Sequence, residues 1–309
     1  MIGLRGVGQS NNNGSGSTLH DLGIPYRLDG PIEQRLPCPR CDRGPRDDAL
    51  GVNIETGAFH CFRCGWSGRA ATGETRAPQP IMRADDPTRA KRVLARLRST
   101  WKASCALDQR GAAPVRRYLE VRGLASILAD TPQALRAHPG LAYFDGFRER
   151  GLFPAMLALL SDRNGDGISL HATYLQPDGS GKAPVPSPKK VLGVPTRGAT
   201  KGGAIRLYQP VDGVLGIAEG IESALSLRVI QRIPVWSAFC ADNLAAVRLP
   251  RLRELHIGVD VDESGKGESA ARHLAHRMTL RHNSPRVMLV FPDGDGPRDL
   301  NDELRRRVN

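Results

Sequence analysis

Residues 214–230 read VLGIAEGIESALSLRVI, in which an apolar strand pattern ends at an acidic residue and a helical pattern follows at once. The same alternation recurs through the rest of the chain. The later strand segments are IPVWSAF (233–239), ELHIGVD (254–260) and PRVMLVF (285–291), with helical patterns near Asn243 and at 267–278. Such alternation predicts a mainly parallel sheet covered by helices. We therefore expect an α/β domain over residues 211–309.

Acidic residues stand where these predicted strands end. They are Glu219, Asp260, Asp262, Asp299 and Asp302. The carboxyl ends of parallel strands open onto one crevice, so residues far apart in the sequence become neighbours there. Asp260 and Asp262 are two residues apart and face the same way in an extended chain, as a shared Mg²⁺ requires. Helix capping is the alternative role for Glu219 and Asp262, because a helix follows each, but capping does not explain the acidic pair or its recurrence.

The preceding residues, 86–210, predict an α+β region. Apolar residues recur at helical spacing from residue 86 to about 107, and a second helix at 115–121 should end before Gly123. The segments AMLALLSD (155–162) and ISLHATYLQ (168–176) read as a hairpin. A loop rich in Gly, Pro and Lys spans 176–203, and loops of this length tend to be functional.

Two motif-like stretches are decoys. The hairpin turn DRNGDG (162–167) begins like an EF-hand loop, but Thr173 stands where the bidentate glutamate belongs, which favours a tight turn. The sequence Gly265-Lys266-Gly267 lies in no P-loop pattern. Since no P-loop occurs anywhere in this sequence, nothing indicates a fused NTP-driven helicase.

Residues 36–69 read LPCPRCDRGPRDDALGVNIETGAFHCFRCGWSGR and predict a zinc ribbon over residues 31–70. Two CxxC turns flank a β-hairpin, and the spacing C-x2-C-x19-C-x2-C is typical of a structural four-thiolate zinc site rather than an iron or redox site. The predicted ligands are Cys38, Cys41, Cys61 and Cys64. His60 should point to the other side of its strand. Phe62 and Trp66 could stack on bases, but packing over the small ribbon is favoured.

The two remaining cysteines, Cys105 and Cys240, stand in apolar surroundings and should simply be buried. Residues 1–30 read as a flexible lead, and residues 71–85 as a linker because they are rich in Ala, Thr, Gly and Pro.

The chain carries a formal net charge of +12, and Arg supplies most of its 44 basic residues. Arg suits bidentate contacts with phosphate, so the charge points to a polyanion such as nucleic acid, although a solvated basic surface is the alternative. No apolar run approaches the roughly 20 residues of a membrane span, and the N-terminus has no secretion signal. We expect a soluble cytoplasmic protein with no membrane partner.

Several of these segments together resemble a known family. EGIES (219–223), DVD (260–262) and DLND (299–302) resemble the Toprim domain shared by bacterial primases and topoisomerases. HCFRCGWSGRA (60–70), YLEVRGL (118–124) and FPAMLALLSDRNGDG (153–167) resemble the zinc domain and catalytic core of DnaG-type primases. The order of ribbon, linker, core half and Toprim domain is similar to a primase over nearly the whole chain after residue 30, above all to primases of phages and mobile elements.

The resemblance implies a DNA primase that copies single-stranded DNA into short RNA primers from ribonucleoside triphosphates, using Mg²⁺ or Mn²⁺. Asp260 and Asp262 would be the main metal ligands, Glu219 a ligand or general base, and Asp299 and Asp302 would support them. The residues expected to contact template or nucleotide phosphates are Arg122, Lys182, Lys189, Lys190 and Arg206. A separate replicative helicase is the expected protein partner.

The sequence departs from the family at two positions. Cys41 stands where DnaG-type zinc domains often have His, which zinc tolerates, and Ser223 stands where an acid often follows the catalytic Glu, with Glu222 beside it. A RecR-like recombination mediator also joins a four-cysteine zinc site to a Toprim domain, but begins with helix-hairpin-helix elements that have no counterpart here. A Toprim nuclease is the further alternative, and a topoisomerase needs a much larger chain.

Overall fold

The computed structural model describes residues 18–27, 30–41, 47–70, 87–145, 148–196, 198–294, 296 and 298–308. These residues form two compact units, one within Met1–Ala84 and the other within Asp85–Asn309. The expected linker 71–85 and residues 1–17 lie outside the described residues.

The first unit is an antiparallel sheet in the order β1-β2-β3-β4. Its strands are β1 (Glu33–Leu36), β2 (Leu50–Asn53), β3 (Ala58–Cys61) and β4 (Ser67–Arg69). The expected hairpin is β2 and β3, which pair with Val52 opposite Phe59. The core of this unit includes Leu50, Val52, Phe59 and Cys61.

Part of the predicted flexible lead belongs to this core. Leu19 and Ile24 are only 4% and 3% exposed and pack against the ribbon. The turn that begins at Thr18 is stabilised by a hydrogen bond from the Thr18 amide to the Asp21 carboxylate (2.8 Å). The prediction of a flexible lead up to residue 30 was therefore wrong for residues 18–27, because two apolar residues were overlooked beside a long polar stretch.

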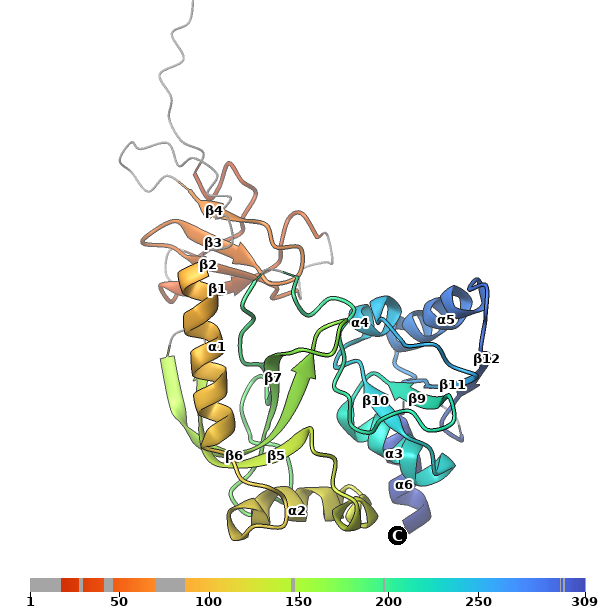
Figure 1. Ribbon diagram of the computed structural model, residues 1–309. Coiled ribbons are helices and arrows are strands. Elements are labelled where there is room, and N and C mark those ends of the chain that lie inside the picture. The colour runs from red at the N-terminus through yellow and green to blue at the C-terminus, as the bar shows by residue number, and fades with distance from the viewer. Residues whose placement is uncertain are drawn as a thin grey trace, which may run out of the picture. The chain divides into compact units, whose positions relative to one another are not determined.

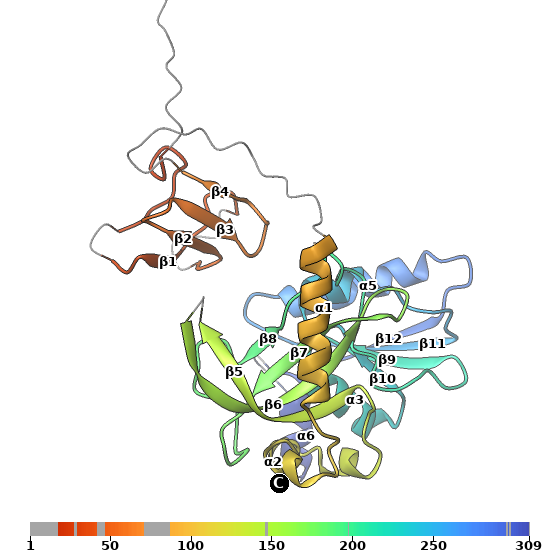
Figure 2. The ribbon, with the colours of Figure 1, turned by 60° about the vertical axis from the view of Figure 1, so that its left-hand side comes forward.

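The second unit begins with an α+β region (Figure 1). Its antiparallel sheet has the order β5-β6-β7-β8, with β5 (Leu135–Asp145), β6 (Arg148–Ser161), β7 (Gly167–Tyr174) and β8 (Lys189–Val191). Helix α1 (Pro87–Lys102) lies along one face of this sheet, as Figures 1 and 2 both show. The short helices η1 (Arg110–Ala112), α2 (Ala113–Val121) and η2 (Ala125–Ala129) connect α1 to the sheet.

The predicted local features of this region are present. Helix α2 ends before Gly123, whose φ of +72° suits glycine. The 162–167 segment is a tight turn: the Asp162 carboxylate accepts hydrogen bonds from the amides of Asn164 (2.8 Å) and Gly165 (2.9 Å). That carboxylate therefore stabilises the hairpin turn between β6 and β7.

The C-terminal region is a four-stranded, wholly parallel sheet in the order β10-β9-β11-β12. The strands are β9 (Val214–Ala218), β10 (Val235–Ser237), β11 (Glu254–Gly258) and β12 (Arg286–Val290). The helices are α3 (Ile221–Gln231), α4 (Ala241–Ala246), α5 (Lys266–Thr279) and α6 (Leu300–Val308). Helices α3 and α6 cover one face and α4 and α5 the other (Figure 1). The predicted α/β domain with a parallel sheet is confirmed.

One apolar core joins the two halves of the second unit. It contains side chains from α2 and the antiparallel sheet, such as Leu119 and Met156, together with Leu225 of α3 and Leu304 of α6. Because these residues are almost fully buried together, the carboxyl edge of the parallel sheet and the loop after β7 are held by one continuous packing arrangement.

Candidate active site and metal centres

The four predicted zinc ligands converge. The Sγ atoms of Cys38, Cys41, Cys61 and Cys64 all lie within 4.8 Å of one another. Four cysteine sulfurs brought together by two CxxC turns are the donor set of a closed structural zinc site, so the cluster fits one zinc ion. Within the described residues, no other group of three or more His, Cys, Asp or Glu side chains converges closely enough to be a metal cluster.

The aromatic residues of the ribbon occupy different environments. Phe59 and Trp66 pack together, with ring centroids 4.6 Å apart, so the packing role favoured for Trp66 is confirmed. Phe62 is 66% exposed, and the Arg35 guanidinium lies 4.2 Å from its ring centre. His60 is exposed, on the side of β3 opposite the buried Cys61, in agreement with its exclusion as a ligand.

Three of the predicted acids are neighbours at the carboxyl edge of the parallel sheet. Glu219 follows β9, Asp260 follows β11 by one residue, and Asp299 precedes α6. Burial, together with the negative charges of Asp299 and Glu219, raises the pKa of Asp260 to about 7. The Asp260 Oδ1 atom is buried and has no hydrogen-bond partner among the residues that the structure describes. A buried carboxylate oxygen without a partner, beside two more carboxylates, fits a hard cation such as Mg²⁺.

Glu219 shares this environment. Burial raises its pKa, and so does the negative charge of Asp262, whereas Lys266 and Lys189 oppose the rise. The end of β10 supports this position, because the Ser237 hydroxyl donates to the Glu219 carbonyl oxygen (2.9 Å). Glu219 is therefore a half-buried carboxylate with nearby charges of both signs.

Asp262 is placed differently from Asp260. It is exposed, and its carboxylate accepts hydrogen bonds from the Ser264 hydroxyl (2.5 Å) and the Gly267 amide (3.1 Å) at the start of α5. The Ser264 hydrogen bond is the main reason that its pKa is lowered. The helix-capping alternative thus describes the present contacts of Asp262, and its role as a metal ligand stays a prediction.

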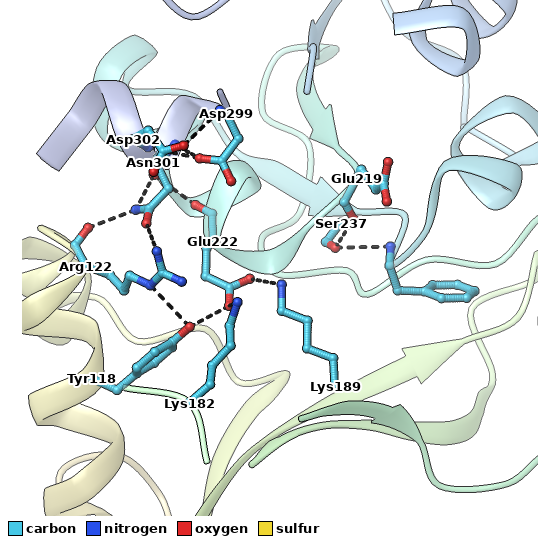
Figure 3. Close-up of polar contacts among 12 residues, drawn as sticks. Tyr118, Arg122, Lys182, Lys189, Glu219, Glu222, Ser237, Asp299, Asn301 and Asp302 are labelled. Carbon is cyan, nitrogen blue, oxygen red and sulfur yellow. Dashed lines mark hydrogen bonds and ion pairs between the residues drawn. The ribbon is translucent and has the colours of Figure 1, made fainter. Parts of the chain in front are cut away.

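Asp299 and Asp302 form a reciprocal cap at the start of α6 (Figure 3). The Asp299 Oδ1 atom accepts from the amides of Asn301 (2.8 Å) and Asp302 (2.9 Å), while the Asp302 carboxylate accepts from the Asp299 amide (3.2 Å). The charge of Asp299 raises the pKa of Asp260. Asp302 is exposed; it caps the Asp299 amide, and its charge raises the pKa of Asp299.

Glu222 is the most strongly held acid of the site, although the sequence assigned it no role. It is 4% exposed, and its carboxylate accepts hydrogen bonds from the Tyr118 hydroxyl (2.7 Å) and the Lys189 ammonium (2.9 Å), with Lys182 Nζ 4.0 Å away. Burial opposes ionisation, but Lys189 and Lys182 outweigh it and keep the Glu222 pKa below its ordinary range. Figure 3 shows both lysines pointing at this carboxylate.

Arg122 and Asn301 extend the network. Arg122 donates to the Tyr118 hydroxyl (3.3 Å) and to the Asn301 side chain (3.1 Å), and Asn301 donates back to the Arg122 carbonyl (2.8 Å). Tyr118 comes from α2 and Arg122 caps its end, whereas Glu222 comes from α3 and Asn301 from α6, so the network ties the antiparallel half to the parallel half. The segments YLEVRGL, EGIES and DLND contain its residues, but the sequence does not show that they contact one another.

The five predicted basic residues separate into two groups. Arg122, Lys182 and Lys189 gather around Glu222, as described above. Lys190 points away: its ammonium donates to the Phe144 carbonyl and lies 4.1 Å from the Tyr143 ring centre. Arg206 contacts the 162–167 turn and lies over the Trp236 ring, 4.7 Å from its centre. Only the first three are therefore part of the candidate active site.

The resulting arrangement is a small α/β domain with carboxylates at one sheet edge and partly exposed lysines opposite them. Residues 214–309 match the family model of the Toprim domain. Residues 91–202 match a domain of unknown function, DUF7146. The resemblance of the C-terminal motifs to the Toprim domain is thereby confirmed.

Solved primase structures are similar to this chain at low identity. A DnaG primase catalytic domain bound to single-stranded DNA is 15% identical with a TM-score of 0.47, covering 72% of this chain and 76% of that chain. The zinc-binding and RNA polymerase domains of the Aquifex aeolicus primase are 15% identical with a TM-score of 0.37, covering 92% and 79%. The primase fragment of the bacteriophage T7 primase-helicase is 15% identical with a TM-score of 0.35, covering 89% and 98%. No curated protein shows a significant match.

Among the described residues, every helix is too short or too polar to cross a membrane.

Proposed function

We propose that this chain is a DNA primase, which joins ribonucleotides into short primers on a single-stranded DNA template. The observation that carries the proposal is that carboxylates of the Toprim domain and a lysine of the preceding antiparallel sheet face each other. The carboxylates of Glu219, Asp260 and Asp299 lie at the sheet edge, and Lys189 faces them. Carboxylates that bind a divalent cation, beside cations that bind phosphate, are the requirements of nucleotidyl transfer.

The residues that would hold Mg²⁺ or Mn²⁺ are Asp260 and Glu219, with Asp262 if it leaves its cap. Mg²⁺ typically takes one or two carboxylates and completes its shell with water and substrate phosphate, which suits a site whose acids do not form a closed cluster. The bound ion would stabilise negative charge on the attacking and leaving oxygens. Zinc would be held by the four cysteines of the ribbon.

The chain's own residues would position the reactants. Lys182 and Lys189 would contact the triphosphate of the incoming nucleotide, while the primer 3′-hydroxyl oxygen bonds to the α-phosphorus. The bond from that phosphorus to its bridging oxygen breaks and pyrophosphate leaves. Glu219 is suited to accept the hydroxyl proton, because burial raises its pKa above the ordinary value and so makes it a stronger base. The ribbon would engage the template, and a separate replicative helicase would supply it.

A single assay tests this function. Purified protein is incubated with single-stranded DNA, Mg²⁺ and labelled ribonucleoside triphosphates, and the products are separated by length. We expect short RNA products that depend on template and on Asp260. DNA binding without any product would favour the recombination mediator, whereas DNA cleavage would favour the nuclease. Template-dependent synthesis by Asp260→Ala at the wild-type rate would refute the metal assignment.

A further inference from the structure

Helix α1 carries an unbalanced positive charge. Between Pro87 and Lys102 it contains no Asp or Glu. Its basic residues are Arg89, Lys91, Arg92, Arg96, Arg98 and Lys102, all exposed. The helix lies at the start of the segment that matches a domain of unknown function. The exposed surface of a helix usually carries both acidic and basic side chains. Basic side chains alone along a whole helix therefore point to a polyanionic ligand.

The basic residues of α1 form two stripes beside its buried face. At about 100° per residue, Lys91, Arg98 and Lys102 fall on one side of the apolar stripe and the other three on the opposite side. The apolar stripe contains Leu97, which is 6% exposed, and the half-buried Trp101. In the described part of the chain, neither Arg98 nor Lys102 has a hydrogen-bond or ion-pair partner, so both cations are available to a ligand.

An apolar groove opens beside these two free cations. It has a volume of about 180 Å³. Its lining includes Leu94, Trp101 and Leu170, and Arg98 and Lys102 stand at its rim. The Arg136 guanidinium lies 5.3 Å from the centre of the Trp101 ring and donates hydrogen bonds to the Ser104 hydroxyl (2.8 Å) and carbonyl (2.6 Å), which holds it there.

We propose that α1 and this groove form a second binding surface for single-stranded DNA, outside the acidic crevice. Arg98 and Lys102 would contact the phosphodiester backbone, and a base would enter the groove beside Trp101. Sequence-independent binding of single strands combines these elements, a line of cations and an aromatic side chain for stacking. The proposal rests on the proposed function only in its choice of ligand, since a primase must hold its template beyond the reacting nucleotides.

The size of the groove argues against a protein partner. Pockets that enclose a whole small ligand measure roughly 300–1,000 Å³, and a partner helix is about 10–12 Å across. A groove of about 180 Å³ suits one planar group. The rim cations also favour a ligand whose charge repeats along its length, as in a nucleic acid strand.

The test measures binding of the full chain to a fluorescein-labelled 20-residue oligo-dT by anisotropy, without Mg²⁺, across a range of NaCl. The double variant Arg98→Ala, Lys102→Ala should lower the slope of log affinity against log salt by about 1.4, since each lost phosphate contact contributes about 0.7. Relative to the difference between variant and wild type at 1 M NaCl, this change of slope corresponds to roughly 25-fold weaker binding by the variant at 0.1 M. The matched control is Arg232→Ala, Arg251→Ala, two exposed arginines at the amino edge of the parallel sheet, with the same loss of charge.

Trp101→Leu gives a second, independent measurement. Loss of stacking should weaken binding about 5- to 150-fold with an unchanged salt slope. If the Arg98, Lys102 variant matches the control in affinity and slope, the proposal is wrong. Competition by polyglutamate as strong as that by oligo-dT of equal charge would also overturn it, in favour of an acidic protein. The binding measurement contains no Mg²⁺ and no nucleotide, so a failure of primer synthesis leaves this test intact.

Discussion

The zinc ribbon and the acidic crevice are both candidate metal sites, but the chain builds them in different ways. The ribbon takes all four ligands from two CxxC turns, and its sulfurs lie within 4.8 Å of one another. The crevice takes Glu219, Asp260 and Asp299 from three separate places along the parallel sheet. Local spacing is therefore sufficient to bring the ribbon sulfurs together, whereas the crevice acids meet only when the whole second unit has folded.

The two sites also differ in how charge is balanced. Around the four thiols, the metal itself would be the main positive charge. The crevice carries its own cations, since Lys189 donates to Glu222 and opposes the rise in the pKa of Glu219 and Asp260. We therefore expect removal of metal to unfold the ribbon and to leave the crevice folded but inactive.

The largest effect should follow loss of zinc. Structural zinc contributes about 10–16 kcal/mol to small metal-dependent domains, so Cys61→Ser should abolish zinc binding and expose the ribbon to proteolysis. Metal analysis and limited proteolysis measure both. Cys105→Ser is the control, because that cysteine lies in the second unit and should leave one zinc per chain. Zinc retained by Cys61→Ser would contradict the assignment of the four cysteines as the zinc ligands.

Removal of the central acid should stop synthesis without unfolding. Asp260→Ala removes the unpartnered carboxylate oxygen that a divalent cation would occupy. The loss of several kcal/mol of transition-state stabilisation corresponds to a fall in primer synthesis of about 1,000-fold. Zinc content should stay at one per chain. The exposed Asp108→Ala serves as the control, and an equal loss in that variant would show that charge alone accounts for the effect.

The Glu222 network should matter mainly for stability. Glu222→Ala leaves the buried Tyr118 hydroxyl without its acceptor, which costs about 1–3 kcal/mol, whereas the partly exposed Lys189 can be solvated. Glu222→Gln keeps an acceptor for the Tyr118 hydroxyl and should cost less. Urea unfolding measures both. Glu120→Ala is the matched control, because Glu120 is exposed and its ion pair with Arg117 (3.5 Å) contributes at most about 1 kcal/mol. Equal costs at the two positions would show that the crevice does not depend on its internal cations.

The sequence predicted those features that depend on neighbouring residues. The CxxC spacing, the hairpin turn at Asp162, the helix end before Gly123 and the alternation of strands and helices each have a local physical cause. The acids were found because parallel strands place their carboxyl ends at one edge, a rule that needs no knowledge of packing.

The Glu222 network could not be predicted in the same way. Tyr118 and Glu222 are 104 residues apart, and Arg122 and Asn301 are 179 apart, so their contacts depend on how α2, α3 and α6 pack. Lys189 and Lys190 alternate across β8, as strand geometry requires, but the sequence does not say which of them faces the acids. Asp262 was uncertain for another reason, since helix capping and metal binding place the same residue type at the same position.

The pH dependence of stability distinguishes the two acids after β11. The folded pKa of Asp260 is raised from 3.8 to about 7, so the unfolded chain loses this proton first as pH rises. Its contribution to the free energy of unfolding therefore falls between about pH 4 and pH 7 and stays low above. In metal-free protein at pH 8, Asp260→Asn should be more stable than wild type by on the order of 3 kcal/mol, with little difference near pH 4.

Asp262→Asn is the control for that measurement, with the opposite sign. The folded pKa of Asp262 is lowered by its cap, so its contribution is present above its ordinary pKa and is lost as pH falls through the folded value. Asp262→Asn should therefore destabilise the protein at pH 8. Added Mg²⁺ should stabilise wild type and not Asp260→Asn. Parallel behaviour of the two variants would refute the separation of a buried site residue from a capping residue.

The smallest effect concerns the boundary of the crevice at α6. Asp302 is exposed and accepts a hydrogen bond from the Asp299 amide, so Asp302→Ala should cost about 1 kcal/mol of unfolding free energy, the typical effect of a lost cap. Primer synthesis should stay within about twofold of wild type, because Asp299 keeps its hydrogen bonds to the start of α6 and its position beside Asp260. A tenfold loss of synthesis with unchanged stability would instead place Asp302 among the metal ligands. The crevice would then include Asp302 as a further negative charge, and Lys189 would balance a smaller share of its total charge.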